Sequence, residues 1–321
     1  MALWLEISVV PFGLNSNKIP ILYVYTVVMN RILALLRLSR PLYLFLAALT
    51  YTLGASIARY LGNQQIQSVF WFGLLAVIMA QLSMSLLVEV FRPFNEPIVA
   101  DETRAERKAM QDLSLYISLA ALTVAGVISF FLFRDRNLTG PSILFLATSL
   151  FVIVIYSVPP LRLVTKGFGE FLLAVQLAYL APSIGFLLQA GNYHRLMSVT
   201  TIPLSVLAFA DFVALDFPAY AEDIKYERGT FLSRLGWERT VPLHHALIVA
   251  AYFLFAVAPL LGFSLSLLWP AFLTLPFALL QIYLLHNIAL GAKPVWNLLI
   301  ANAIALFGLT AYFLTLTFWL R

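Results

Sequence analysis

Long apolar runs separated by short polar segments dominate the pattern of this 321-residue chain. A membrane-spanning helix needs about 20 mostly apolar residues, and runs of that length recur along the chain. Pro and Gly inside several runs do not exclude helices, because neighbouring membrane helices satisfy the freed backbone groups. The pattern therefore predicts nine spans, at 42–61, 68–90, 113–133, 140–157, 169–190, 199–219, 242–263, 265–286 and 295–319.

Composition excludes a soluble protein with an unusually large core. Hydrophobic residues make up 62% of the chain and charged residues 11%, whereas soluble domains have roughly 45–50% and about 25%. The mean hydropathy of +0.91 agrees with a membrane protein. The chain has no cysteine, which excludes disulfides, thiolate metal sites and a cysteine nucleophile.

Positive charges predict the orientation of the spans. With a cytoplasmic N-terminus, 15 of the 20 Lys and Arg residues fall in cytoplasmic segments, as the positive-inside rule expects. This rule and anionic lipid headgroups explain the net charge of +5 without nucleic acid. The remaining five basic residues lie on the other side: Arg59, Arg134, Arg136, Arg195 and Arg321.

The chain is interpreted as one membrane domain, 29–321, behind an N-terminal extension of unknown role, 1–28. The extension lacks the basic segment and cleavage site of a signal peptide. Residues 30–40 form a basic amphipathic stretch, which predicts an interfacial helix ahead of the first span.

Acidic residues at the ends of two apolar runs are candidates for function, because ionisable side chains are costly at membrane depth. Asp216, Tyr220 and Asp223 follow helical spacing and share one stripe of a helix. Two carboxylates on one face can bind a hard cation such as Mg2+. Glu89 and Glu96 repeat the same spacing after the second span, although a proline interrupts the helix between them.

Other charged residues leave alternatives open. The run 101–108 is interpreted as a solvated rim, and Asp211 is either a site member or a helix-packing partner. The two acidic loops lie four spans apart on the same predicted side of the membrane, and an amphipathic stretch follows each loop. This arrangement favours a diverged internal duplication.

The segment after the fourth span supplies cations. Pro159 and Pro160 end that span. Arg162 and Lys166 then lie at the membrane surface, where a guanidinium fork and an ammonium group suit a phosphate. Ordinary positive-inside anchoring is the alternative interpretation.

At these residues the chain resembles the UbiA superfamily of intramembrane prenyltransferases. The segment 156–170 reads Tyr-Ser-x-Pro-Pro-Leu-Arg-Leu, then Lys166, Gly167, Gly169 and Glu170, and is similar to the family's loop after helix 4. The segment 229–236 resembles the glycine–threonine and Arg-Leu-Gly run after the family's second Asp-rich motif, and Arg40-Pro41 also fits. The resemblance implies an all-α, multi-pass bundle of nine transmembrane helices around a central cavity, with a cytoplasmic N-terminus.

The resemblance also implies a chemistry: transfer of a polyprenyl group from its diphosphate to an aromatic acceptor, with Mg2+ as cofactor, in quinone biosynthesis. The carboxylates that it assigns to metal binding and catalysis are Asp216, Asp223, Glu89 and Glu96. The cations assigned to the diphosphate are Arg92, Arg162, Lys166 and Lys225. Further candidates are Asp211, Tyr220, Glu222, Asn95 and Tyr156.

This sequence departs from the family pattern at both acidic motifs. Ala219 replaces the middle carboxylate of the second motif. In one register of the first motif Arg92 stands where the family has a metal ligand, and in another, anchored on Asn95-Glu96-Pro97, Leu87 and Phe91 occupy the acidic positions. A lipid- or quinone-binding membrane subunit with altered or no catalysis is therefore an alternative. An ion-coupled transporter is another, because Asp211, Gln176 and Gln281 lie within predicted spans.

Arg92 itself allows two opposite interpretations. Its planar fork can replace one Mg2+ by pairing with a phosphate oxygen and with Glu89 or Glu96. Alternatively, it can hold those carboxylates in ion pairs and close the metal site.

Overall fold

The computed structural model describes residues 32–98, 102–135 and 138–321. The predicted extension 1–28 lies outside the described residues, and the structure tests only part of the predicted interfacial helix, where residues 32–38 are helical. Nine helical segments within the described ranges are long and apolar enough to cross a membrane. They are Pro41–Tyr60, Gln67–Val90, Arg104–Arg134, Gly140–Ser157, Gly169–Ala190, Arg195–Lys225, Trp237–Ala256, Leu265–Ala289 and Trp296–Leu320.

Six of the described spans are single helices: α2 (Pro41–Tyr60), α3 (Gln67–Val90), α4 (Arg104–Arg134), α5 (Gly140–Ser157), α11 (Trp237–Ala256) and α14 (Trp296–Leu320). The span Gly169–Ala190 comprises α6 (Gly169–Ala174), one π-helical segment and α7 (Ala181–Ala190). The next comprises α8 (Arg195–Asp216), a short 3₁₀ turn and α9 (Tyr220–Lys225). The span Leu265–Ala289 is also broken and ends in α13 (Leu275–Ala289).

The third span differs most from the expected boundaries. Helix α4 (Arg104–Arg134) begins nine residues before the predicted start of that span. The Thr103 side chain accepts a hydrogen bond from the Glu106 backbone N–H, and the Glu106 side chain accepts one from the Thr103 backbone N–H. This reciprocal pair is a capping box. At about 1.5 Å per residue the helix is longer than the roughly 30 Å hydrocarbon core. Its first turns therefore carry charged residues that were expected in a loop.

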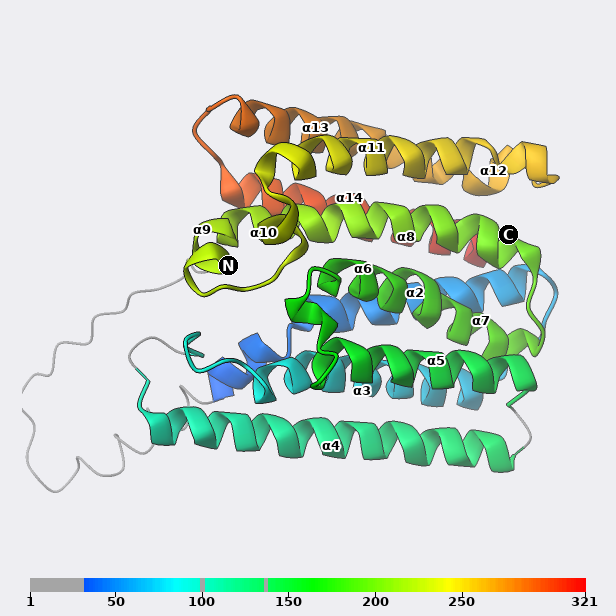
Figure 1. Ribbon diagram of the computed structural model, residues 1–321. Helices are drawn as coiled ribbons and strands as arrows, with labels where there is room; N and C mark the ends of the chain where they lie inside the picture. The colour runs from blue at the N-terminus through cyan, green and yellow to red at the C-terminus, as the bar shows by residue number, and fades with distance from the viewer. Residues whose placement is uncertain (1–31, 99–101, 136–137) are drawn as a thin grey trace, which may run out of the picture.

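The helices run side by side, as Figure 1 shows, with α4 along one edge beside α3 and with α11 and α13 at the other edge. The segments 91–98, 158–168 and 226–236 meet at one end of the bundle, which we call the polar end. Helix α2 begins at the polar end, whereas the last residue, Arg321, donates a hydrogen bond to the Ser266 hydroxyl at the opposite end. The ends of the described chain thus lie on opposite sides of the bundle.

Close contact between α2 and α7 holds the centre of the bundle together. A Cβ atom on Gly54 would overlap the Pro182 carbonyl oxygen, and one on Gly185 would overlap the Tyr51 carbonyl oxygen. Small residues at a helix interface allow backbones to approach closely, which drives association where the solvent is lipid. The neighbouring Phe186 side chain is fully buried.

We predict that Gly54→Ala destabilises the bundle by about 1–3 kcal/mol, because the backbone of α7 cannot yield to the added methyl group. Thermal unfolding in detergent measures the change. Gly126→Ala in α4 is the matched control, since a Cβ atom there meets no heavy atom within 4 Å. Equal melting temperatures for the two variants would contradict the proposed packing.

Candidate functional site

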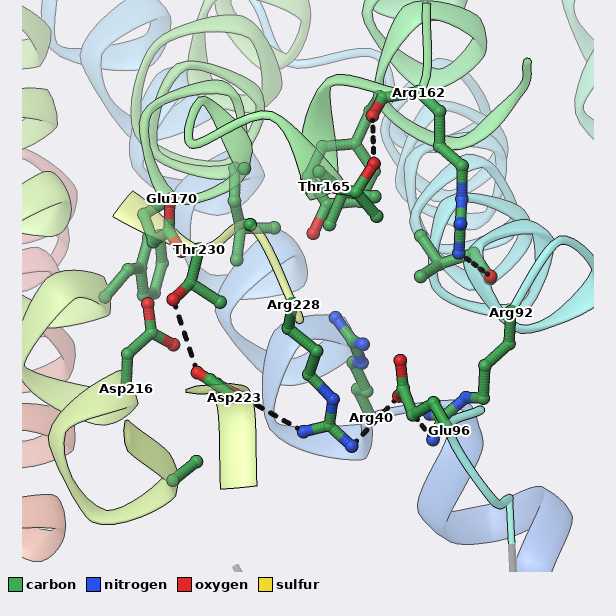
Figure 2. Close-up of a pocket in the computed structure, with 18 of the residues that line it drawn as sticks. Arg40, Arg92, Glu96, Arg162, Thr165, Glu170, Asp216, Asp223, Arg228 and Thr230 are labelled. Carbon is green, nitrogen blue, oxygen red and sulfur yellow. Dashed lines mark hydrogen bonds and ion pairs between the residues drawn. The ribbon is translucent and has the colours of Figure 1, made fainter. Parts of the chain in front are cut away.

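A charged pocket lies at the polar end, where the segments after α3, α5 and α9 meet the start of α2 (Figure 2). Four arginines line it: Arg40, Arg92, Arg162 and Arg228. Four acidic residues also line it: Glu96, Glu170, Asp216 and Asp223. Its deeper wall is apolar and aromatic, with contributions from Val88, Leu173, Tyr43 and Phe212.

Alternating charges connect the first acidic segment to the start of α2. Arg40 Nη2 lies 3.4 Å from Glu89 Oε1. Arg92 Nε donates to Glu89 Oε2 at 2.7 Å, and Arg92 Nη1 lies 2.7 Å from Glu96 Oε1. Glu89, at the end of α3, is only 1% exposed, so two guanidinium groups neutralise a carboxylate that water barely reaches.

The same chain of charges continues into the second acidic segment. Arg228 Nη2 lies 2.9 Å from Glu96 Oε1, and Arg228 Nη1 lies 3.1 Å from Asp223 Oδ1. Thr230 donates its hydroxyl to Asp223 Oδ2 at 3.3 Å. We call the series Arg40, Glu89, Arg92, Glu96, Arg228 and Asp223 the ion-pair chain; its members from Glu96 to Asp223 appear in Figure 2.

Arg107 of α4 fixes the backbone on which Arg92 is placed. Its guanidinium donates to the carbonyl oxygens of Arg92, Pro93 and Phe94, and it pairs with Glu102 at 3.2 Å. Arg107 is 5% exposed and spans from α4 to the segment after α3. This anchor explains how a proline-containing loop can hold two charged side chains in one position.

Two arginine nitrogens at the pocket have no acceptor within the described ranges. Arg162 Nε and Arg228 Nε are buried and have no hydrogen-bond partner among the described residues. Arg162 Nη2 donates to the Val88 carbonyl oxygen at 3.3 Å, and burial lowers the pKa of Arg162. A buried donor left unpaired costs free energy, which an anion in the pocket would recover.

Backbone strain accompanies two of these arginines. Arg40 has φ 51° and Arg162 has φ 36°, so both occupy the left-handed region that non-glycine residues rarely adopt. Each such residue costs on the order of 1 kcal/mol and persists when surrounding contacts hold it. Strain of this kind gathers at functional sites.

The opposite side of the pocket is an acidic corner. Asp216 and Glu170 both line this side of the pocket, and Glu170 accepts the backbone N–H of Phe231 at 3.2 Å. Asp216 Oδ2 is buried and has no partner within the described part of the chain. Two adjacent carboxyl groups can share a proton or bind one cation.

The structure brings many of the predicted site residues together. Glu96, Asp216, Asp223, Arg92, Arg162 and Tyr156 all line the pocket. Glu89 lies behind its wall, within the ion-pair chain. The assignment of Glu89 to metal binding stays a prediction, which this geometry does not favour because both of its carboxylate oxygens face arginines.

Other predicted residues lie outside the lining of the pocket. Lys166 and Lys225 are exposed: Lys166 Nζ donates to the Pro160 carbonyl oxygen, and Lys225 lies over the Tyr226 ring. Asn95 is exposed and donates to the Tyr226 carbonyl oxygen. Glu222 is exposed, and Tyr220 packs edge-on against Trp237.

The intramembrane polar residues behind the transporter alternative do not line this pocket. Asp211 is 2% exposed in α8, with both carboxylate oxygens unpartnered among the described residues. Gln176 donates to the Ser149 hydroxyl at 2.8 Å, and Gln281 accepts from Asn302 at 2.6 Å. These two amides therefore connect neighbouring helices.

Sequence reasoning about candidate residues missed four members of the pocket. Arg40, Glu170 and Thr230 lie in segments that carry the family resemblance, so their type and place were visible but their roles were not. Arg228 carried no signal beyond its position in a charged loop. Its partner Glu96 is 132 residues away, and only the folded chain brings the two together.

An apolar helix bundle with a charged pocket at one end defines a class of intramembrane proteins, and solved structures identify the fold. The chain matches a UbiA homolog from Archaeoglobus fulgidus bound to GPP and Mg2+ with a TM-score of 0.62 and 15% identity, covering 87% of this chain and 98% of that one. A structure of a UbiA homolog from that organism bound to DMAPP and Mg2+ gives 0.58 and 14%, covering 89% and 99%.

Sequence comparisons give no corresponding match: no family model fits the chain, and no curated protein does. The structural likeness confirms the predicted fold, so the chain has the UbiA fold.

Gly229 joins two of the loops around the pocket. A Cβ atom at this position would overlap the Thr165 carbonyl oxygen, so the loops after α5 and α9 approach through a glycine. We predict that Gly229→Ala separates them and speeds amide hydrogen exchange in residues 226–231, with a cost of about 1–3 kcal/mol. Gly140→Ala is the control, because its Cβ meets nothing within 4 Å. Unchanged exchange in Gly229→Ala would show that the loops do not pack this way.

Proposed function

We propose that this protein is a membrane prenyltransferase that binds a polyprenyl diphosphate in the charged pocket and transfers the prenyl group to an aromatic acceptor. One observation carries the proposal: Arg162, Arg228 and Asp216 line the same pocket, and among the described residues a buried Nε of each arginine and a buried carboxylate oxygen of Asp216 have no partner. The two arginines therefore lack an anion, and Asp216 lacks a cation. A diphosphate with one bound metal ion satisfies both.

The residues present fit one Mg2+ at the acidic corner. Mg2+ commonly binds through one or two carboxylates and completes its octahedron with water and substrate phosphates. Asp216 and Glu170 supply such a pair. No group of three or more His, Cys, Asp or Glu side chains able to hold a metal occurs in the described ranges, so substrate oxygens and water would have to complete the coordination.

In this proposal the arginines bind and orient the diphosphate while the apolar wall contacts the prenyl group. The allylic C–O bond breaks, and pyrophosphate leaves with the electron pair and its charge stabilised by guanidinium groups. A ring carbon of the acceptor then forms the new C–C bond and releases its proton to water. When bound, Mg2+ would add Lewis-acid neutralisation of the leaving group.

Further parts of the proposal rest on the resemblance in fold and on charge. The pocket would face the cytoplasm, because most Lys and Arg residues lie in segments at the polar end. The acceptor would be a quinone precursor, as expected for this superfamily. The solved UbiA homologs hold GPP or DMAPP with Mg2+, which supports a prenyl diphosphate as donor.

The ion-pair chain also favours a second candidate function. Glu89, Glu96 and Asp223 are already paired with arginines, an arrangement that would suit a subunit that binds a prenyl diphosphate without turning it over. The two functions share the donor pocket and differ in whether the C–O bond breaks.

Activity with Mg2+, radiolabelled prenyl diphosphates and aromatic acceptors tests the first candidate. We predict product formation by the wild type and a loss of about 100-fold or more in Asp216→Asn, because an amide cannot balance a metal charge. Glu238→Gln is the control, since Glu238 is exposed in the first turn of α11 and does not line the pocket. Donor binding without product would favour the second candidate. Equal losses in both variants would place the chemistry elsewhere.

A further inference from the structure

The ion-pair chain leaves little room for a metal ion on the side of the first acidic segment. Glu89 pairs with the guanidinium groups of Arg40 and Arg92. Glu96 pairs with those of Arg92 and Arg228. A metal ion at these carboxylates would have to displace those arginines and would bring a second cation beside them. This part of the pocket therefore already holds the positive charge that a metal would supply.

The same wall has donors to spare for an anion. A guanidinium has five N–H groups. Arg228 pairs its two terminal nitrogens with Glu96 and Asp223, and its buried Nε has no partner in the part of the chain that the structure describes. Arg162 has no carboxylate partner among the described ion pairs, and its buried Nε is also unpaired. Arg92 differs, because it pairs through Nε and Nη2 with Glu89 and through Nη1 with Glu96 and the Pro97 carbonyl oxygen, so it contributes positive charge beside the pocket rather than a spare donor.

We propose that Arg162 and Arg228 bind the diphosphate directly in place of a metal ion, with the charge of Arg92 beside them, so that the pocket binds pyrophosphate without any divalent cation. This inference deepens the proposed function and rests on it for the identity of the donor. Planar forks are well suited to phosphate oxygens, and the charge that they carry does not depend on pH near neutrality. The single Mg2+ at Asp216 and Glu170 then serves turnover rather than capture of the substrate.

Arg162 provides the cleanest test of this inference. Its replacement removes no carboxylate ion pair, whereas loss of Arg228 would leave Asp223 without its arginine partner and loss of Arg92 would remove one partner from both Glu89 and Glu96. Arg162→Gln removes the charge and Arg162→Lys keeps the charge but removes the planar fork. Arg104→Gln is the matched control, because Arg104 is exposed at the start of α4 and does not line this pocket.

The experiment is isothermal titration of the full-length protein in detergent with inorganic pyrophosphate, in EDTA and in Mg2+. We expect binding in EDTA with an affinity within about tenfold of that in Mg2+. Arg162→Gln should weaken pyrophosphate binding in EDTA by about ten- to a hundredfold. Arg162→Lys should bind more tightly than Arg162→Gln but less tightly than the wild type, because it keeps the charge and loses the planar fork. Arg104→Gln should bind like the wild type, and each variant should keep the wild-type melting temperature.

Three outcomes would overturn the inference, and a fourth would separate it from catalysis. Binding that requires Mg2+ and disappears in EDTA would show that a metal captures the diphosphate, although prenyl transfer could still occur. Orthophosphate binding as tightly as pyrophosphate would show a general anion site. Binding in EDTA together with no product in the transfer assay would keep the inference and reject catalysis. No pyrophosphate binding in either buffer would reject both proposals.

Discussion

The arrangement of the pocket depends on the ion-pair chain between the two acidic segments. Charged groups at the end of a membrane helix bundle are stable only when they are paired, because removing one partner of a buried pair costs about 3–5 kcal/mol. Here Arg92 and Arg228 share Glu96 and so connect the segment after α3 to the segment after α9. Arg40 brings the start of α2 into the same network through Glu89.

This network defines both what the pocket can bind and what it excludes. Its arginines neutralise the carboxylates of the first segment, which leaves Asp216 and Glu170 as the acidic pair without an arginine partner in the described ion pairs. The pocket is therefore polarised, with guanidinium donors on one wall and carboxylate oxygens in the opposite corner. A ligand that carries both negative charge and a metal ion complements this polarity better than a simple anion or a simple cation does.

The fold could be predicted from the sequence because a bilayer imposes a minimum length on each apolar run. Lipid imposes no such rule on the charged ends, which explains why α4 starts earlier than expected: its capping box lies in a polar run with no hydrophobic boundary. Composition and spacing also could not show which spans lie side by side. The contact between α2 and α7 depends on glycines whose role is visible only in the packed structure.

Within the site, spacing identified the acidic residues but not their environments. Glu89 and Glu96 have the same separation as Asp216 and Asp223, yet α3 ends at Val90 and only Glu96 turns into the pocket. In the loop after α5, Arg162 has a left-handed backbone and lines the pocket, whereas Lys166 is exposed outside it. Such outcomes depend on backbone direction and on partners far away in the sequence, as the pairing of Arg228 with Glu96 shows.

The central claim is that guanidinium groups replace metal ions on one side of the pocket. An experimental structure of the protein with Mn2+ and a non-hydrolysable prenyl thiolodiphosphate tests this claim most directly, because anomalous scattering locates and counts the metal ions. We predict one Mn2+ at Asp216 and Glu170, with Arg162 and Arg228 in direct contact with the diphosphate. Two Mn2+ ions that bridge the diphosphate, with one of them bound to Glu89 or Glu96 and the arginines displaced, would contradict it.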